Sequence, residues 1–172
     1  MCGVCCSALL LTASPAKADN LKAAQRLLAV GSVREQFETQ TRLQARAIIR
    51  HYDVIVASSA AMQLPDTLKR DIADCYESVY AWEKFEPGIT QIFADNLTEK
   101  ELLLLTDFYD NLGLPPGDIA AFKAIIAKAN AIQSQSLEYI FEHSASCVES
   151  DVERILDYVF TQGIEPLPPS SE

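Results

Sequence analysis

Residues 33–62 read VREQFETQTRLQARAIIRHYDVIVASSAAM, and none of the six glycines of the chain lies in this stretch. It shows no alternation of apolar and polar residues, which a half-buried strand requires. It therefore predicts one long helix. We expect this helix to end before Leu64-Pro65, because the residue that precedes a proline is pushed out of helical geometry.

The same pattern predicts helices over most of the chain. Apolar residues recur at intervals of three and four, as in Leu68, Ile72 and Val79, and so mark one face of a helix. Pro87-Gly88 is expected to break or kink the chain. The predicted helices cover residues 21–30, 33–62, 66–86, 89–96, 99–112, 118–144 and 151–162. The sequence thus predicts an all-α fold, a compact bundle of about six to seven helices.

Three S/T-x-x-E signatures support the predicted helix starts. They are Ser32-Val-Arg-Glu35, Thr98-Glu-Lys-Glu101 and Ser150-Asp-Val-Glu153. In such a capping box the hydroxyl and the carboxylate bond backbone N–H groups that have no partner in the first turn. A helix is therefore expected to begin directly after the first residue of each signature.

The first residues predict a signal peptide. An apolar run over residues 4–13 leads to Ala16 and Ala18, the A-x-A pattern after which signal peptidase cleaves. We therefore expect residues 1–18 to be removed and one helical domain to span residues 19–164. The leader has no Lys or Arg before its apolar run, which favours a start further upstream. A buried N-terminal segment is the alternative interpretation.

Export changes how the cysteines are interpreted. Cys2, Cys5 and Cys6 lie in the leader, so Cys75 and Cys147 remain in the mature chain. In an oxidising compartment such an isolated pair favours a disulfide. Closing a loop of roughly 70 residues would stabilise the fold by about 4 kcal/mol. Two separately buried thiols are the alternative.

The net charge of the chain disfavours one class of partner, nucleic acids. Its formal net charge is −10, which argues against nucleic-acid binding because that binding needs a basic surface. After the leader, no apolar stretch approaches the ~20 residues of a membrane span. Residues 165–172, rich in proline and serine, are expected to form a disordered tail. These observations predict an acidic periplasmic protein without a transmembrane span.

The segment NLTEKELLLLTDFY, residues 96–109, resembles the motif F-T-x-x-E-L-x-x-L-x-x-F-Y. The matching residues are Thr98, Glu101, Leu102, Phe108 and Tyr109, and Leu97 replaces the first Phe. The motif is typical of a family of exported, all-helical bacterial proteins catalogued as a domain of unknown function. The resemblance implies the helical fold and export, and it transfers no catalytic residue. The matching residues also have a structural interpretation, because Thr98 and Glu101 can form a capping box.

Signatures of metal and nucleophile chemistry are missing from the sequence. Its two histidines, His51 and His143, lie in different predicted helices, and no Glu-x-x-His motif occurs. It contains no G-x-S-x-G motif and no glycine-rich loop that could hold a phosphate. The sequence therefore predicts a protein that is not an enzyme and has no cofactor.

One row of side chains is a candidate binding site. Arg42, Arg46 and Arg50 are four residues apart on the long predicted helix, so they share one face. The planar arginine group suits carboxylates and phosphates, which indicates an anionic ligand or an acidic partner. Pairing with acidic neighbouring helices, or solvation, is the alternative.

We therefore expect an exported, non-catalytic interaction module of the bacterial cell envelope. Its expected partner is another envelope protein, because the sequence shows no convergent polar residues typical of a small-molecule pocket. A small-molecule or lipid-binding periplasmic bundle, holding a small apolar ligand, is the alternative. The sequence does not predict the oligomeric state.

Overall fold

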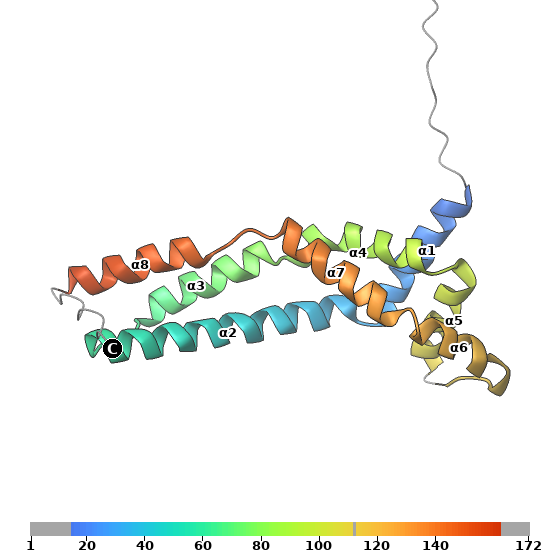
Figure 1. Cartoon of the computed structure of the whole chain (residues 1–172), viewed down its shortest axis with the longest axis horizontal. Helices are drawn as coiled ribbons and strands as arrows, with labels where there is room; N and C mark the ends of the chain where they lie inside the picture. The colour runs from blue at the N-terminus through green and yellow to red at the C-terminus, as the bar shows by residue number, and fades with distance from the viewer. Residues whose placement is uncertain (1–14, 112, 163–172) are drawn as a thin grey trace, which may run out of the picture. The chain divides into compact units, whose positions relative to one another are not determined.

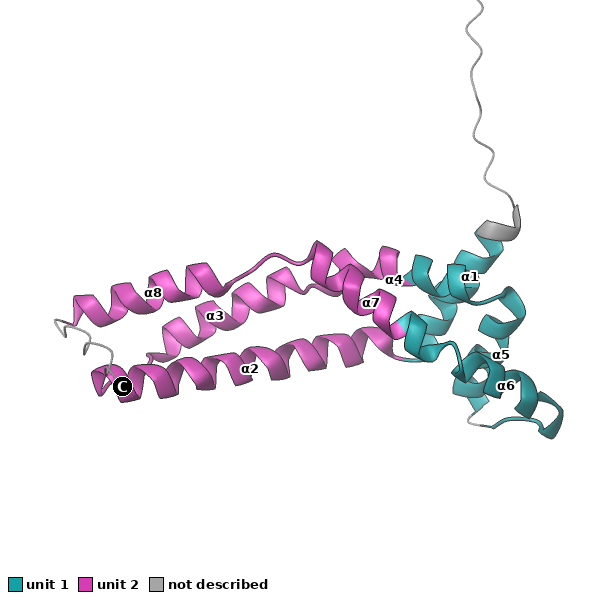
Figure 2. Ribbon diagram, viewed as in Figure 1, with its two compact units in different colours: residues 1–31, 90–132 teal, residues 32–89, 133–172 magenta. Residues whose placement is uncertain are grey.

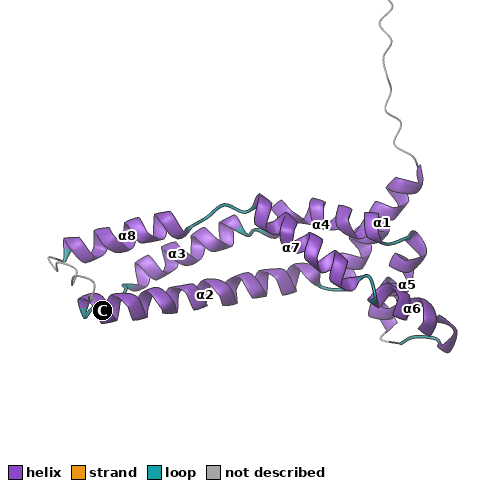
Figure 3. Ribbon diagram, viewed as in Figure 1, coloured by secondary structure: helices purple, strands orange, loops and turns teal. Residues whose placement is uncertain are grey.

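The computed structural model describes residues 15–111 and 113–162, and helices account for most of them (Figure 1). The α-helices are α1 (Pro15–Val30), α2 (Val33–Ala60), α3 (Asp66–Val79), α4 (Trp82–Asn96), α5 (Glu99–Asn111), α6 (Ile119–Ile126), α7 (Ala129–His143) and α8 (Val148–Thr161). A 3₁₀ helix, η1 (Pro116–Asp118), precedes α6. This described part contains no strand (Figure 3). The prediction of an all-α fold is therefore confirmed.

Two of the predicted segments fall largely outside the described residues. Of the predicted leader, residues 1–18, only the last four are described, and they belong to the first turn of α1. The predicted tail, residues 165–172, lies wholly outside the described residues. The cleavage of the leader and the disorder of the tail stay predictions.

The helices divide into two compact units, which Figure 2 distinguishes by colour. Unit 1 comprises the described residues of 1–31 and 90–132, and unit 2 those of 32–89 and 133–172. The boundaries fall after Gly31, within α4 and within α7. Since one domain can contain two such units, the predicted domain span of 19–164 stays a prediction.

In unit 2, helix α3 packs against both α2 and α8. Two contacts fix the direction of α8. The sulfur of Cys147, just before α8, lies at bonding distance from that of Cys75 near the end of α3, and the Tyr158 hydroxyl near the end of α8 donates to the Gln63 carbonyl just before α3. Helix α8 therefore runs antiparallel to α3. Because α2 and α3 are joined by a short turn and packed together, α8 runs parallel to α2.

The core of unit 2 is formed by the apolar faces of these three helices. Ile72 of α3 is completely buried, and Leu68 and Tyr76 lie on the same face, as the intervals of four predict. The other buried members of this cluster are Ala45, Val56, Ala60, Leu64, Cys147, Ile155 and Val159. Packing of these faces, rather than helix propensity, accounts for most of the stability of such helices.

The turn from α2 to α3 is held by one side chain. Asp53 accepts a hydrogen bond from the Leu64 backbone N–H at 3.0 Å and pairs with Lys69 at 2.6 Å. The hydrogen bond from Lys69 is the main cause that lowers the pKa of the Asp53 carboxyl. The helix ends before Leu64-Pro65, which confirms the prediction, and Ala61 terminates it in the left-handed conformation, with φ of 53°.

The predicted helix 66–86 is divided, because the break falls at Tyr80-Ala81 rather than at Pro87-Gly88. Pro87 lies inside α4, where its ring removes one backbone donor. Burial of Phe85 and Ile89 on either side outweighs this loss. Gly88 is required for a different reason, since a Cβ there would overlap the Tyr139 ring of α7.

The predicted helix 118–144 is also divided, at Ala127-Lys128. The Lys128 N–H donates to the Ile125 carbonyl at 2.9 Å, a tighter turn than that of an α-helix. This turn lets Ile125 and Ile132 both enter the core of unit 1. Periodicity does not reveal the break, because the sequence has no glycine or proline there.

Two of the three predicted capping boxes are wrong. Ser32 occupies the N-cap of α2, but its side chain makes no capping hydrogen bond. Helix α8 begins at Val148, so Ser150 lies inside the helix. The box at Thr98 and Glu101 is present and belongs to the candidate site described below.

In unit 1, helix α5 packs against α1 and α6. Leu102 of α5 and Ala24 of α1 are completely buried. The other buried members of the cluster are Ala23, Leu27, Ala94, Leu97, Ile125 and Ile132. The run of four leucines thus supplies a core residue, while Leu103 remains 42 % exposed.

Candidate functional site

The predicted arginine row lies on the solvent-exposed side of α2. Arg42, Arg46 and Arg50 are all exposed, and we call them the arginine face. Arg42 donates a hydrogen bond to the Thr39 hydroxyl at 3.1 Å. Arg46 and Arg50 form no hydrogen bond or ion pair with any residue that the structure describes. The face therefore presents positive charge that the described part of the chain does not neutralise.

A fourth arginine on the same helix shows the contrast. Arg34 pairs with Glu38 at 2.8 Å and with Glu83 of α4 at 2.5 Å. The hydrogen bond to Glu38, followed by the charge of Glu83, raises the pKa of the Arg34 guanidinium. The alternative interpretation, pairing with acidic neighbours, thus holds for Arg34 and not for the arginine face.

A small open hollow of about 260 Å³ lies beside the first residue of the arginine face. It is lined by Glu38, Thr41, Arg42, Glu77, Tyr80, Ala81, Trp82 and Glu83. Trp82 is 3 % exposed, so its ring is mostly part of the core, where it lies 5.5 Å from the Phe37 ring. Three carboxylates make the hollow acidic, and they disfavour an anionic small molecule in it.

The two cysteines of the predicted pair are brought together. Their sulfurs are 2.03 Å apart and their Cα atoms 6.1 Å apart, although 72 positions separate Cys75 from Cys147 in the sequence. This is disulfide distance, which confirms the predicted pair. The link joins α3 to the residue that precedes α8.

A buried carboxyl lies one helical turn beyond this link. The Asp151 backbone N–H donates to the Cys147 carbonyl at 2.9 Å, and the Asp151 side chain is completely buried. Neither of its oxygens lies within hydrogen-bonding geometry of another described residue, and the same holds for the buried Tyr76 hydroxyl. Tyr52 of α2 and Tyr76 of α3 are the groups from the other helices whose hydroxyls influence the pKa of this carboxyl. Three helices thus meet at one polar group that no sequence pattern indicates.

Burial dominates the electrostatics of this group. It raises the pKa of the Asp151 carboxyl, and the Tyr76 hydroxyl, the Arg154 charge and the Tyr52 hydroxyl offset only part of that rise. Burial likewise raises the pKa of both tyrosine hydroxyls. The neutral form of Asp151 is therefore the form that the core favours.

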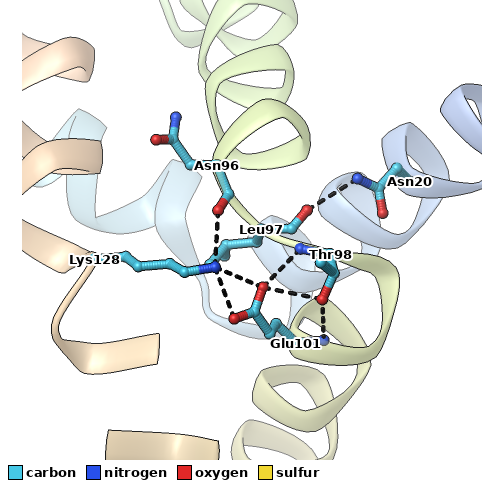
Figure 4. Close-up of polar contacts among 6 residues, drawn as sticks. All are labelled: Asn20, Asn96, Leu97, Thr98, Glu101 and Lys128. Atoms are coloured by element: carbon cyan, nitrogen blue, oxygen red, sulfur yellow. Dashed lines mark hydrogen bonds and ion pairs between the residues drawn. The ribbon is translucent and has the colours of Figure 1, made fainter. Parts of the chain in front are cut away.

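The residues of the family-like motif form a network at the start of α5, which Figure 4 shows. The Thr98 N–H donates to the Glu101 carboxylate at 2.8 Å, and the Glu101 N–H donates to the Thr98 hydroxyl at 3.4 Å. This reciprocal pair is the predicted capping box. Lys128 extends it with two bonds to the Glu101 oxygens, at 2.7 and 2.8 Å, and one to the Asn96 carbonyl, at 3.2 Å.

The same network binds the end of α4 to α1. The Asn20 amide donates to the Ala94 carbonyl at 2.7 Å and to the Leu97 carbonyl at 2.9 Å, and Figure 4 draws the second of these bonds. The Ala94 carbonyl is one of the last four of α4, which a helix leaves without a partner, and the Leu97 carbonyl lies between α4 and α5. Lys128, and then the Thr98 N–H, lower the pKa of the Glu101 carboxyl. Thr98, Glu101 and Lys128 bond to one another, and Asn20 bonds to backbone carbonyls, which indicates a structural role.

The remaining motif residues are also structural. Leu102 is completely buried, and the Phe108 ring lies 4.9 Å from the Phe122 ring of α6. Tyr109 packs edge-to-face on Phe108 and is 47 % exposed. The sequence does not predict the roles of Asn20 and Lys128, because neither residue belongs to a recognisable motif. Their hydrogen-bond partners are known only from the fold.

Two negative findings concern the described residues. Within residues 15–111 and 113–162, no three His, Cys, Asp or Glu side chains lie together as metal ligands would. None of the helices in that part of the chain has both the length and the apolar character that crossing a membrane requires.

The chain matches no protein-family model, no curated protein and no solved structure. The resemblance of residues 96–109 to the exported helical family therefore stays a prediction.

Proposed function

We propose that this protein is an exported, non-catalytic helical module of the bacterial cell envelope that binds an acidic protein through its arginine face. One observation carries the proposal. The chain has 24 acidic side chains, yet Arg46 and Arg50 pair with none of those that the structure describes. Clusters of exposed arginine are typical of surfaces that bind carboxylates.

The dimensions favour a protein over a small ligand. From Arg42 to Arg50 the arginine face extends about 12 Å along α2, at about 1.5 Å per residue. A row of this length suits an extended acidic surface better than one small anion. The adjacent hollow has an acidic lining that includes Glu77 and Glu83, so an anionic small molecule gains nothing from it.

Two observations support export. The leader has the A-x-A pattern that ends at Ala18, and Cys75 and Cys147 lie at disulfide distance, as in a protein from an oxidising compartment. Intact-mass measurement of the protein from its native host tests this part. A mature chain that begins at Asp19 supports it, and a chain recovered from the cytosol with its leader attached contradicts it.

The binding surface is tested by crosslinking in cells, followed by mass spectrometry. The variant Arg42→Gln, Arg46→Gln, Arg50→Gln should lose the partner that the natural sequence captures. Because the three side chains are exposed, we expect the free energy of unfolding to change by less than about 1 kcal/mol.

A matched control removes the same charge elsewhere. Arg26, Arg70 and Arg154 are also exposed, and their joint replacement by Gln should leave the partner bound. Equal crosslinking in both triple variants would contradict the proposal.

The alternative function, a small-molecule or lipid carrier, has weaker support. A hollow of about 400 Å³ between α3 and α8 is open and includes the charged residues Asp71, Arg154 and Asp157 in its lining. A lipid carrier needs an enclosed apolar space instead.

A further inference from the structure

Helix α8 exposes a row of large apolar side chains along its whole length. Val148, Val152, Leu156 and Phe160 are four residues apart and are 51, 44, 44 and 57 % exposed. The core-facing row of the helix, which carries Asp151, Ile155 and Val159, lies about 100° away around the helix axis. We call the exposed row the α8 stripe. Single exposed apolar residues are ordinary on a surface, but a continuous row indicates a contact surface.

A ladder of carboxylates runs beside the α8 stripe. Glu149, Glu153 and Asp157 each follow one residue of the stripe, are exposed, and form no ion pair with any residue in the described part of the chain. Their spacing of four residues equals the spacing of Arg42, Arg46 and Arg50 on α2. The two ladders therefore have the same rise and opposite charge.

The arginine face also has apolar residues beside it. Leu43 follows Arg42 and is 51 % exposed, and Val54, four residues after Arg50, is 67 % exposed. Each of the two surfaces thus combines exposed apolar side chains with a row of charged side chains that form no ion pair among the described residues. A specific interface needs this combination.

We propose that the α8 stripe of one copy of this chain packs against α2 of a second copy, with the carboxylate ladder facing the arginine face. This inference rests on the proposed function, because it names the acidic partner of the same site. A second copy is a partner that is always present with the chain, and it carries a ladder of matching spacing and opposite charge.

The order of residues sets the direction of the contact. In α2 the arginine precedes its apolar neighbour, as in Arg42-Leu43, whereas in α8 the carboxylate follows it, as in Val148-Glu149. Since both helices are right-handed, the two ladders lie along the same edge of the contact only when the helices are parallel. Helices α2 and α8 are parallel within one chain, so a twofold axis along them lets both copies make the same contact.

The contact is small. Helix α8 has 14 residues and is about 21 Å long, so even two such contacts stay at the lower end of specific interfaces. We therefore expect reversible association that depends on protein concentration.

Sedimentation velocity of the mature chain with exchanged charges tests the inference. Glu149→Lys, Glu153→Lys, Asp157→Lys should raise the dissociation constant of self-association at least about tenfold, because like charges then face each other. Arg42→Glu, Arg46→Glu, Arg50→Glu should have the same effect. An equimolar mixture of the two variants should associate again, since every charged row then faces a row of opposite charge. For the same reason a chain with all six changes should self-associate.

The control variant replaces three exposed carboxylates outside the ladder with Lys and should leave association unchanged. These residues are Asp107, Glu138 and Glu142. Helicity measured by circular dichroism identifies a variant that fails to fold. In that case the self-association of the chain with all six changes tests the inference. Three results overturn the inference. They are a natural chain that stays monomeric at every concentration, a mixture of the two variants that fails to associate, and a control variant that self-associates as weakly as the ladder variants do. A monomeric natural chain whose arginine face still crosslinks to another acidic protein overturns this inference alone and leaves the proposed function standing.

Discussion

Replacing Asp151 with Asn should remove one part of the pH dependence of stability. Asp151 is completely buried between α2, α3 and α8, and neither of its oxygens has a hydrogen-bond partner among the described residues. Asn has nearly the same shape and cannot ionise. The substitution therefore isolates the cost of charging this one group inside the core.

The sign follows from the direction of the pKa shift. Burial raises the pKa of Asp151 in the folded chain, while in the unfolded chain it stays near ~3.9. Below that value the carboxyl is neutral in both states and costs nothing. As the pH rises through the folded pKa, the unfolded state holds fewer protons and the free energy of unfolding falls, by about 1.4 kcal/mol for each unit of the shift.

The size can be bounded from the geometry. A buried polar group without a hydrogen-bond partner costs about 1–3 kcal/mol. Because Tyr52, Tyr76 and Arg154 offset part of the cost of ionisation, we expect the lower half of that range. Asp151→Asn should therefore gain about 1–2 kcal/mol relative to the natural chain once the pH is above the raised pKa of Asp151 in the folded chain.

Urea unfolding at several pH values measures this difference directly. The quantity of interest is the free energy of unfolding of Asp151→Asn minus that of the natural chain, with the disulfide intact in both. Asp74→Asn, which removes an exposed carboxyl from α3, is the control and should not reproduce the gain of Asp151→Asn. If the difference for Asp151→Asn does not change with pH, the cost of ionising Asp151 in the core is absent.

Three further changes test other parts of the structure. Lys128→Met should lower the free energy of unfolding by about 1 kcal/mol at neutral pH, because the Glu101 carboxylate loses its cation. This loss should disappear as the pH falls through the lowered pKa of Glu101, measured by urea unfolding. Replacing Cys75 and Cys147 with Ser should cost about 4 kcal/mol, since the link closes a loop of 72 positions, and a chain that begins at Asp19 should show no free thiol before reduction. Ala61→Gly should raise the melting temperature and add about 1 kcal/mol, because Ala61 has a φ of 53°.

Two of these changes have a matched control variant. Lys123 is exposed on α6, so Lys123→Met should leave the urea midpoint unchanged. An effect equal to that of Lys128→Met would show that the ion pair between Lys128 and Glu101 does not stabilise the fold. Ala57 is exposed inside α2, where Gly should cost about 1 kcal/mol; a loss of stability in Ala61→Gly as well would show that the left-handed conformation is not strained. Two free thiols in the unreduced chain would contradict the disulfide.

Local sequence patterns are sufficient to predict much of the fold. The absence of glycine and proline predicts α2, and Leu64-Pro65 predicts its end, because both act through the backbone of a few residues. The capping box at Thr98 and Glu101 is predictable for the same reason. The paired cysteines are predictable from their number and from the expected compartment.

The errors arise where tertiary packing outweighs local preference. Pro87 breaks an isolated helix, yet it lies inside α4 because Phe85 and Ile89 are buried on either side of it. The break at Lys128 has no local signal, since it depends on Ile125 and Ile132 both reaching the core.

The candidate site is predictable only in part. Spacing alone places Arg42, Arg46 and Arg50 on one face, but only the fold distinguishes them from Arg34, whose partners include Glu83, 49 positions away in the sequence. Asp151 belongs to a supposed capping signature, and its burial depends on two other helices. Long-range partners of this kind cannot be obtained from periodicity.

Photo-crosslinking from one position beside the arginine face tests whether this face is a binding surface. A photoreactive amino acid in place of Leu43, which is 51 % exposed beside Arg42, should give a covalent adduct in cells. We expect one predominant adduct, to a second copy or to another acidic protein, that disappears when the three arginines become Gln. No adduct from this position, or the same adduct without the arginines, would contradict it.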